Sequence, residues 1–547
     1  MKPNNEEYLV PIRQALRACR KCRNKMKFAD STGMQVTGGK TLLLSIIFRR
    51  LLRRYLGTDE QNVGVLMPTS VYGAIVNLAL ALDRRTSVNL NYTFGVDTID
   101  YCTKNAGIKH VITSRKVLEQ EKFKNVKLDA EFLVLEDLGK GITLLDKIIG
   151  FIDGYITPVS IYERVIGLTK IQQDDILTIF FTSGSTGTPK GAAITQRCIA
   201  ANVAGFSERL ALIPEDILLG ALPFFHSFGF TTTIWLPATK ELSSVFHFNP
   251  LDPKKVGEMV QKYCCTAMPT TPTFLRGYLR RCSEEEFESM DTIICGAEKL
   301  PLDLIDAWEQ KFGIRPTEGY GTTELSPVVS VGGPKAKRTD YQDFLREGSI
   351  GRPLFNLSVR ITDPETGEVL PIDTPGMLEV KGPSVMKGYY NDPEKTAAVL
   401  KDGWYSTGDI ATVDKDGFIW ITGRLSRISK IGGEMVPHIL VEEEIEKIVR
   451  SAAANVSETD TESNEILAAV SAVPEEKKGE KLVVLHREIS ITPEEICRLL
   501  QNAGLPNLWI PSPSEFYQVD SLPLLGTGKL DLKSIKEMAE EKTGRKS

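Results

Sequence analysis

Short apolar runs alternate with longer amphipathic stretches from about Val63 to Val329. The runs Gly107 to Thr113 and Asp291 to Cys295 each precede a turn, as expected of buried strands. Val63 to Met67 is a further run of this kind, and the apolar stretch that follows Pro68-Thr69-Ser70 predicts a buried helix. Strands and helices in regular alternation predict an α/β fold.

The pattern changes at about Gly348. From there to residue 422, glycine and proline separate short alternating runs such as Met377 to Lys381 and Gly417 to Ile421, which is typical of antiparallel β-structure. The smaller segment after residue 424 contains a predicted helix, Ile439 to Val449, and a polar stretch, Ser451 to Asn464, that predicts a surface loop. We predict an N-terminal domain, residues 1–425, with a β-rich subdomain at about 348–424, and a C-terminal domain, residues 426–547.

Composition limits the class of protein. A chain of 547 residues is too long for one hydrophobic core, so at least two domains are expected. A net charge of −5 argues against a general nucleic-acid binder. Nine cysteines, behind a polar and acidic start without signal-peptide character, predict free thiols in a reducing compartment. The expected location is cytoplasmic, with peripheral association at the inner face of the membrane left open.

Two N-terminal stretches are strongly basic. Arg13 to Lys27 contains seven basic residues and no acid. In the stretch from Leu43 to Tyr55, apolar residues form one face and four arginines the other. This amphipathicity fits a core helix with a solvated basic face, and it also fits binding to a membrane surface. A membrane span is rejected at Val63 to Leu82 and at Ile217 to Pro237, since prolines interrupt both.

A loop rich in glycine and hydroxyl residues follows the apolar run Ile176 to Phe181. Its glycines let the backbone approach a ligand, while backbone N–H groups, hydroxyls and one lysine suit phosphate oxygens. The spacing is not that of a P-loop, and the partial match at Gly38-Gly39-Lys40-Thr41 is better interpreted as a turn that opens a helix. The candidate phosphate-binding residues are Thr182, Ser183, Gly184, Ser185, Thr186, Gly187 and Lys190.

Further motifs follow in a fixed order, and together with this loop they define a resemblance. They are Gly296-Ala297-Glu298-Lys299-Leu300, Glu318 to Glu324, Trp404 to Asp409 with Gly423-Arg424, and Leu522 to Lys529. In this order and spacing the chain resembles, over nearly its whole length, the adenylate-forming superfamily of acyl-CoA synthetases, peptide-synthetase adenylation domains and luciferases. The resemblance implies a large N-terminal domain of stacked α/β subdomains with a small β-barrel-like subdomain, followed by a small mobile α+β C-terminal domain.

The resemblance also implies a reaction that uses ATP and Mg²⁺. A carboxylate first joins AMP while pyrophosphate leaves, so positioning and electrostatic stabilisation carry most of the catalysis. Lys529 is expected to bridge the ATP phosphate and the substrate carboxylate, Thr323 to contact the α-phosphate, and Glu324 to hold Mg²⁺. The residues expected around adenine are Gly296, Ala297, Glu298, Gly319 and Tyr320, with Gly321 and Thr322 in the same loop, and those expected at the ribose are Asp409 and Arg424.

In this superfamily the C-terminal domain rotates after adenylation, and the pivot falls two residues after the arginine. The hinge residue here is Ser426. Most relatives carry Asp or Lys at this position, so the chain departs from the pattern where the rotation is controlled.

The segment Leu222 to Phe230 bears on the substrate. Amino-acid-activating relatives carry an aspartate near the position of His226, and this chain has none, so an amino acid is disfavoured. His226 is expected to close over the carboxylate or to gate a tunnel, and a fatty acid is the expected substrate. The residues expected to line an apolar tunnel, or in part to belong to the core, are Phe224, Phe228, Phe230 and Trp235.

A narrower resemblance bears on the thiol acceptor. Four segments look like the acyl-ACP synthetase half of bacterial acyl-ACP synthetase/lysophospholipid acyltransferase proteins: Leu222 to Gly229, Gly296 to Leu300, Ile431 to Val436 and Leu522 to Lys529. They imply a ligase that forms a carbon–sulfur bond with the phosphopantetheine thiol of acyl carrier protein, and CoA is the alternative acceptor. Arg427 and Lys430 are the predicted basic surface for the acidic carrier.

Two other classes of function are weighed. A catalytically silent lipid-binding relative is expected to lack Lys529, Glu324 or Lys190, and all three are present. A membrane acyltransferase is rejected because His247 and Asp252, which formally match its His-x4-Asp signature, lie inside the synthetase region without a companion motif.

Overall fold

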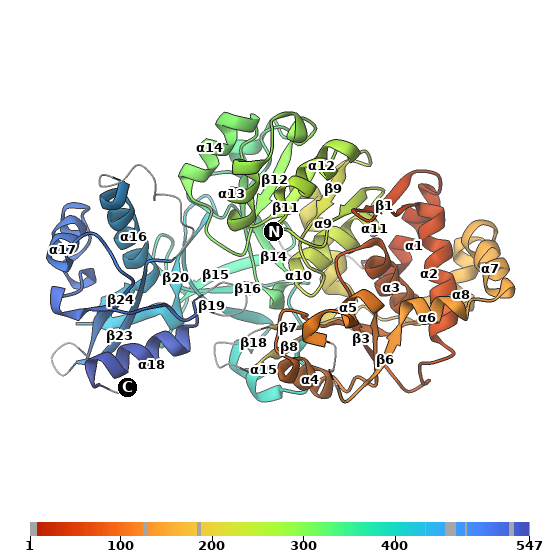
Figure 1. Ribbon diagram of the computed structural model, residues 1–547, viewed down its shortest axis with the longest axis horizontal. Helices are drawn as coiled ribbons and strands as arrows, with labels where there is room; N and C mark the ends of the chain where they lie inside the picture. Colours follow the sequence, from red (N-terminus) through yellow and green to blue (C-terminus); the bar gives the residue numbers. More distant parts are fainter. Residues whose placement is uncertain are drawn as a thin grey trace.

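The computed structural model describes residues 8–545 except 124, 125, 127, 183–187, 433, 455–465, 476–478 and 525–529. Figure 1 shows a large body, formed by the chain up to the antiparallel strands β19 (Trp404–Val413) and β20 (Ile419–Arg424), and a smaller lobe at the left that contains the C-terminus. The expected large N-terminal and smaller C-terminal parts of an α/β protein are confirmed.

A seven-stranded sheet carries the first functional motif. Its strand order is β17-β8-β7-β4-β3-β5-β6, and β3, β4, β5, β6 and β7 pair in parallel. At one side β7, β8 and β17 pair antiparallel. The strands are β3 Asn62–Leu66, β4 Thr86–Asn89, β5 His110–Thr113, β6 Glu131–Val134, β7 Ile176–Thr182, β8 Lys190–Thr195 and β17 Gly388–Tyr389.

An eight-stranded sheet, in the order β14-β13-β12-β11-β9-β10-β1-β2, carries the adenine motifs. Only its two edge strands pair antiparallel. Its main helices are α9 (Gln196–Arg209), α12 (Pro253–Tyr263), α13 (Pro272–Arg281) and α14 (Leu302–Phe312). The strands are β1 Met26–Asp30, β2 Gln35–Thr37, β9 Ile217–Gly220, β10 Ser243–Phe246, β11 Ala267–Thr270, β12 Thr292–Cys295, β13 Thr317–Gly321 and β14 Val328–Val331.

Two five-stranded sheets complete the fold. The first is antiparallel and consists of β15 (Ser358–Thr362), β16 (Gly376–Lys381), β18 (Leu400–Lys401), β19 and β20. The second belongs to the C-terminal lobe and packs against helices α16 (His438–Ala454), α17 (Pro493–Asn502) and α18 (Leu532–Thr543). Its strands are β21 Ile428–Ile431, β22 Glu434–Pro437, β23 Ala468–Glu475, β24 Gly479–His486 and β25 Phe516–Gln518.

Most of the elements predicted from the pattern are present. The run from Val63 and its helix correspond to β3 and α3 (Val71–Leu82), and Ile176 to Phe181 corresponds to β7. The predicted loop from Ser451 is wrong for its first four residues, which complete α16, and 455–465 lie outside the described residues. All nine cysteines lie in the described part of the chain, and none is in a disulfide. No helix of the described chain combines the length and the apolar character that crossing a bilayer requires.

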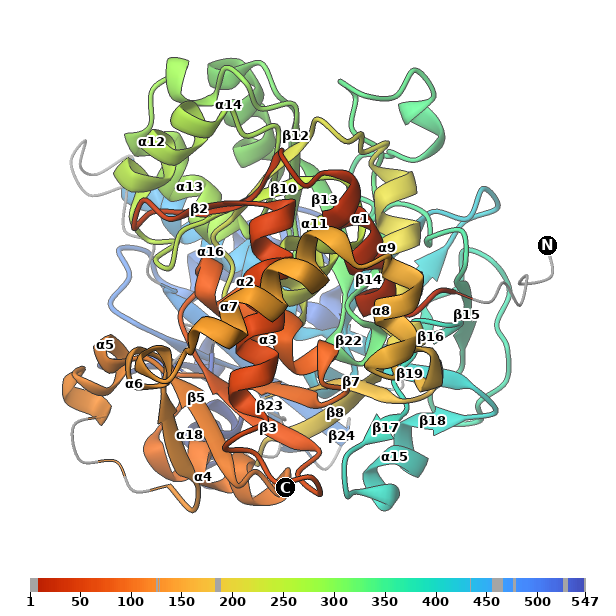
Figure 2. The same cartoon turned by 90° about the vertical axis from the view of Figure 1, so that its right-hand side faces the viewer.

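The basic N-terminal stretches form α1 (Pro11–Lys21) and α2 (Gly38–Leu52) with the turn after it, and several of their arginines form ion pairs although they are partly exposed. Figure 2 shows α7 (Leu144–Phe151) and α8 (Val159–Val165) lying over these helices. Glu163, which is buried, pairs with Arg13 and Arg17 at 3.0 and 3.2 Å, and buried Asp146 pairs with Arg50 and Arg54 at 3.1 and 2.6 Å. The basic side chains therefore hold a later segment of the chain in place.

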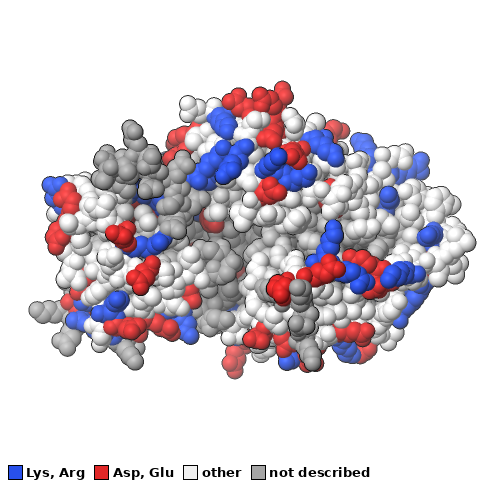
Figure 3. All heavy atoms as spheres, viewed as in Figure 1, with Lys and Arg blue, Asp and Glu red and all other residues white. Residues whose placement is uncertain are grey.

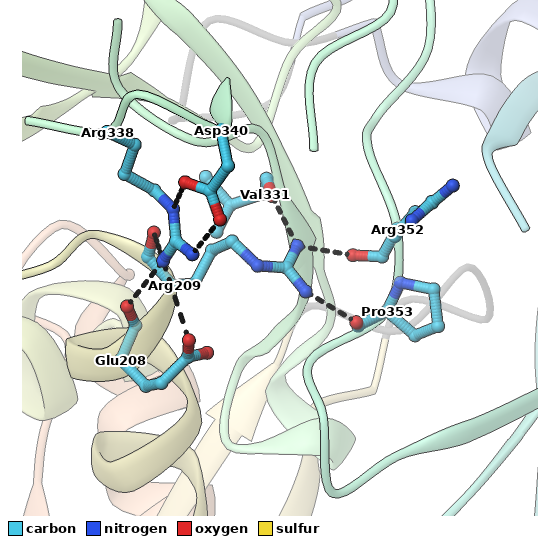
Figure 4. Close-up of polar contacts among 7 residues, drawn as sticks. All are labelled: Glu208, Arg209, Val331, Arg338, Asp340, Arg352 and Pro353. Atoms are coloured by element: carbon cyan, nitrogen blue, oxygen red, sulfur yellow. Dashed lines mark hydrogen bonds and ion pairs between the residues drawn. The ribbon is translucent and has the colours of Figure 1, made fainter. Parts of the chain in front are cut away.

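Arg209, at the end of α9, connects two parts of the large body (Figure 4). Its guanidinium donates to the carbonyl oxygens of Val331, Arg352 and Pro353 at 2.8, 2.9 and 2.8 Å. The side chain is buried, and this burial lowers its pKa to about 10, so the guanidinium is still charged at neutral pH. Arg209 thus fastens the segment that enters the antiparallel sheet to the edge strand β14.

We predict that Arg209→Leu lowers the free energy of unfolding by about 3 kcal/mol, because three buried or part-buried carbonyl groups lose a charged donor. Urea denaturation measures the change. Arg280→Leu, at an exposed position on α13, is the matched control and is expected to stay within about 0.5 kcal/mol of the wild type. Equal effects of the two substitutions would contradict this role for Arg209.

Candidate functional site

The ends of the predicted phosphate loop are cross-strand neighbours. Thr182, at the end of β7, faces Lys190, at the start of β8, in antiparallel register. The predicted residues between them, Ser183, Gly184, Ser185, Thr186 and Gly187, lie outside the described residues. Since β7 and β8 pair from Ile176 to Thr182, the sheet holds both ends of this loop at one edge.

Tyr389 connects this loop with the predicted magnesium ligand. The ammonium group of Lys190 lies 5.4 Å from the centre of the Tyr389 ring, and the Tyr389 hydroxyl donates to Glu324 Oε1 at 2.9 Å. Burial, followed by the Glu324 charge, raises the pKa of Tyr389, so its hydroxyl remains a donor. Thr323, next to Glu324, accepts from the Ser227 hydroxyl at 3.3 Å. Two motifs more than 100 residues apart thus meet at one tyrosine.

A second cluster brings together three predicted nucleotide-binding residues. Asp409 on β19 and Arg424 on β20 are cross-strand partners, and Arg424 Nε donates to Asp409 Oδ1 at 2.8 Å. The Tyr320 hydroxyl donates to the other oxygen of this buried carboxylate. Burial, and then the Asp409 charge, raises the pKa of Tyr320. The cluster presents one carboxylate and one guanidinium, which suit hydrogen bonds to hydroxyl groups.

The predicted adenine segments lie next to each other. Gly296 follows β12, and Gly319 belongs to the neighbouring parallel strand β13. A Cβ atom at Gly296 would lie 3.4 Å from the Gly319 carbonyl oxygen and 3.4 Å from the Phe228 ring. Glu298 accepts from the Thr273 hydroxyl at 2.7 Å. Ala297, between Gly296 and Glu298, is exposed and has a φ of +70°.

The turn after Tyr320 requires glycine for space. A Cβ atom at Gly321 would lie 2.0 Å from the carbonyl oxygen of Pro327, which also accepts from the Thr322 N–H at 3.1 Å. Any side chain at Gly321 would push apart the strands β13 and β14 that position Thr323 and Glu324.

His226 is exposed at the start of a short helical segment, Ser227–Gly229, and its ring lies 4.7 Å from that of Phe225. The aromatic side chains expected to line a tunnel are mostly in the core instead. Phe224, Phe230 and Trp235 are fully buried in the main hydrophobic core, and only Phe228 is half-buried. Of the two expectations for these residues, tunnel lining or membership of the core, the three follow the second, because their rings pack between the sheets.

Lys529 lies outside the described residues, between Leu524 and Leu530, which form an antiparallel bridge. Ser426 belongs to a single 3₁₀ turn, Leu425–Arg427, between β20 and β21. The predicted hinge therefore sits at the junction of the antiparallel sheet with the C-terminal sheet.

The predicted carrier-binding surface at Arg427 and Lys430 is wrong for Arg427. Its side chain is buried and forms an ion pair with Glu442, which also accepts from the Val470 N–H at 2.6 Å. Lys430 is exposed but pairs with Glu365 of the large body at 2.6 Å. An arginine that neutralises a buried carboxylate cannot also serve an external partner.

Two residues in contact with the site did not stand out in the sequence. Tyr389 and Ser227 touch Glu324 and Thr323, but Tyr389 belongs to none of the motifs, and Ser227, although it lies in the segment Leu222 to Phe230, was assigned no role. Only the folding together of distant strands reveals them.

Burial raises the pKa of Glu318, on β13, to about 7, although the Leu300 N–H donates to it at 3.4 Å. The folded state thus binds this proton more tightly than the unfolded chain between about pH 4.3 and 7. The stability that Glu318 contributes is present at low pH and is lost as the pH rises through about 7. Glu318→Gln removes this titrating group. We therefore predict that the free energy of unfolding of the variant, minus that of wild type, increases by about 2 kcal/mol between pH 5 and pH 8.

Urea denaturation at the two pH values measures this effect. Glu288→Gln, at an exposed position, is the matched control and should follow the wild type. A constant difference between Glu318→Gln and wild type across the range would show that the carboxyl group does not titrate in it.

The chain is similar to known proteins in both sequence and fold. Residues 17–390 match the family described as AMP-binding enzyme. The chain is 28% identical to a long-chain-fatty-acid–CoA ligase of Yersinia pestis, over 94% of this chain and 92% of that protein. It is 32% identical to a feruloyl-CoA synthase of Amycolatopsis sp., over 65% and 68% of the two chains.

Solved structures share the fold. ATP-bound MatB from Rhodopseudomonas palustris superposes with a TM-score of 0.78 at 24% identity, and covers 97% of this chain and 99% of its own. The o-succinylbenzoate CoA synthetase of Bacillus subtilis, in complex with its acyl-adenylate, gives a TM-score of 0.78 at 21% identity, with 96% and 98% covered.

The chain belongs to the AMP-binding enzyme family. It is an ATP-dependent ligase that forms acyl-adenylates, and its cofactors are ATP and Mg²⁺. The residues present fit both cofactors. Glu324 offers the oxygen ligand that Mg²⁺ prefers, and Asp409 with Arg424 offers acceptors and donors for the ribose hydroxyl groups.

Proposed function

We propose that this enzyme activates a fatty acid as its acyl-adenylate and transfers the acyl group to a phosphopantetheine thiol. The observation that carries the adenylation step is the meeting of Lys190, Tyr389 and Glu324 at the mouth of the phosphate loop. The choice of a fatty acid is supported by the similarity, along nearly the full chain, to a long-chain-fatty-acid–CoA ligase. It is further supported by the absence of an aspartate near His226 in the sequence.

In the proposed reaction, basic side chains bind the phosphates and an acidic side chain binds Mg²⁺. Lys190 and the loop from Thr182 hold the β- and γ-phosphates, Glu324 holds Mg²⁺, and Lys529 neutralises charge between the carboxylate and the α-phosphate. Thr323 orients the α-phosphate, and exposed His226 covers the carboxylate. The remaining nucleotide contacts come from the adenine segments after β12 and β13 and from Asp409 and Arg424.

We further propose that the C-terminal domain, residues 426–547, rotates about Ser426 between the two half-reactions. Among the described residues, two ion pairs join the lobes: Lys299 with Glu443 at 2.7 Å, and Lys430 with Glu365 at 2.6 Å. Both lysines are more than half exposed, and such surface pairs typically contribute about 1 kcal/mol or less. They oppose a rotation only weakly.

CoA is the acceptor that the named relatives support, since the similar fatty-acid ligase of Yersinia pestis is a CoA ligase. Acyl carrier protein is the second candidate, supported by the motifs around Leu222 to Gly229 and Leu522 to Lys529. Arg427 gives it no support, because that side chain is buried.

Thioester formation with free CoA and with phosphopantetheinylated carrier protein, at equal thiol concentration, separates these candidates. We expect a larger kcat/KM for CoA. A larger kcat/KM for carrier protein would transfer the proposal to an acyl-ACP synthetase, and thioester formation with neither acceptor would contradict the second half-reaction.

A further inference from the structure

Exposed large apolar side chains are concentrated in one short segment of the molecule, residues 143–170, here called the 143–170 hairpin. It consists of α7, a π-helical turn at Ile152–Ile156, and α8. Among the described residues, 8 of the 20 exposed large hydrophobic side chains lie between Leu144 and Val165. Leu144 and Val165 are 74% and 76% exposed, and Leu145, Ile148, Phe151 and Ile156 contribute to the same segment. Scattered apolar residues are normal on a surface, but such a concentration marks a binding face.

The opposite face of the hairpin is shaped to pack on α2. A Cβ atom at Gly150 would lie 2.7 Å from the Ile47 side chain, and one at Gly154 would lie 3.4 Å from the Leu43 backbone. Gly39, in the first turn of α2, leaves room for the Tyr155 ring in the same way. These close approaches fix which side of the hairpin faces the protein, so the apolar side chains cannot turn inward.

Charge fixes the same orientation. Asp146 and Glu163 have side chains only 1% exposed; Glu163 pairs with two arginines of α1, and Asp146 with Arg50 of α2 and with Arg54 just after it. Separation from its arginines would leave either carboxylate without its partners, which is costly for a buried charge. The acids of the hairpin are therefore directed toward the protein.

The exposed charges of the hairpin are all basic. Lys147, Arg164 and Lys170 are exposed, and the remaining acid, Asp153, is half-buried and accepts from the Thr157 hydroxyl at 3.1 Å. In Figure 3 the end of the molecule formed by α7 and α8 is mostly white with isolated blue spheres. An apolar face edged by lysine and arginine complements an anionic lipid surface in both hydrophobicity and charge.

We propose that the 143–170 hairpin seats this enzyme on the surface of an anionic lipid bilayer. Leu145, Ile148 and Phe151 enter the boundary between headgroups and acyl chains, and Lys147 and Arg164 lie over anionic headgroups. This replaces the basic stretch Arg13 to Lys27 as the membrane-binding element, because Arg13 and Arg17 are engaged with Glu163.

The hairpin lies at the end of the molecule opposite the C-terminal lobe (Figure 1). A bilayer at this end leaves the lobe clear to rotate. At the bilayer the enzyme would meet fatty acids that partition into membranes, and this consequence rests on the proposed function. Binding to the bilayer itself does not rest on it.

Co-sedimentation with vesicles of phosphatidylcholine, with and without phosphatidylglycerol, tests the proposal. Wild type should bind the phosphatidylglycerol vesicles more tightly than the neutral ones. The variant Leu145→Gln/Ile148→Gln/Phe151→Gln should lose at least about tenfold in affinity, and Lys147→Glu/Arg164→Glu should lose the preference for anionic lipid. The matched control is Phe355→Gln/Val369→Gln/Ile372→Gln, which changes three side chains of similar exposure elsewhere and should bind like wild type.

Unchanged vesicle binding by the hairpin variant, or absence of binding by wild type, would overturn the proposal. If analytical ultracentrifugation showed a wild-type dimer that the hairpin variant dissociates, the face would instead belong to a second copy of the chain. Pyrophosphate exchange dependent on fatty acids of short to long chain length, without vesicles, is measured in parallel. Its absence would count against the proposed function and leave the vesicle result standing.

Discussion

Lys529→Ala is expected to slow adenylation by a factor of about 10² to 10³, the usual loss when one transition-state contact to developing charge is removed. Transfer of the acyl group from preformed acyl-adenylate to the thiol should change little, since the proposed rotation moves this lysine away before transfer. Single-turnover measurements of the two half-reactions separate these effects.

Lys533→Ala is the matched control for Lys529→Ala. Lys533 is an exposed lysine on α18, four residues further along, and its loss should leave both half-reactions unchanged. Equal losses in the two half-reactions for Lys529→Ala would contradict the role assigned to this residue.

Asp409→Ala is expected to lower kcat/KM for ATP by about 10²-fold or more, because hydrogen bonds to a charged group contribute about 1.5 to 3 kcal/mol each. The substitution removes the common acceptor of Tyr320 and Arg424, so neither side chain keeps its position. KM for ATP should rise while KM for the fatty acid stays close to that of wild type.

Asp416→Ala, at an exposed carboxylate in the hairpin between β19 and β20, is the matched control and should leave ATP kinetics unchanged. Urea denaturation of the Asp409 variant distinguishes misfolding from loss of the ATP contact. A folded Asp409→Ala enzyme with normal ATP kinetics would remove Asp409 from the nucleotide site.

Local patterns in the sequence predicted the strands that carry the site. Apolar runs such as Ile176 to Phe181 become buried strands because burial of a central strand needs little beyond continuous hydrophobicity. The family resemblance assigned Tyr320 to adenine and Asp409 and Arg424 to the ribose, and the structure brings the three side chains into one hydrogen-bonded cluster.

Predictions failed where long-range pairing decides the outcome. The arginines in and after α1 and α2 resembled a solvated face, but four of them pair with Asp146 or Glu163, which follow 92 to 150 residues later. Arg427 was expected at the surface and neutralises Glu442 instead. Phe224 and Phe230 cannot be told from tunnel residues by hydrophobicity, since only the packing of neighbouring sheets determines which aromatic rings lie in the core.

The exposed hairpin illustrates the same limit. Its apolar residues follow a helical pattern that normally predicts a core-facing stripe. Because the polar groups of this segment pair with α1 and α2, the stripe faces outward. Local amphipathicity marks two faces of a helix but does not say which one meets the protein.

Isotope exchange between pyrophosphate and ATP tests the central claim most directly. We expect exchange that requires Mg²⁺ and is stimulated by long-chain fatty acids, with little stimulation by amino acids or by aryl acids such as ferulate. Exchange with amino or aryl acids and none with any fatty acid would contradict the proposed substrate, and exchange with no carboxylic acid at all would contradict adenylation itself.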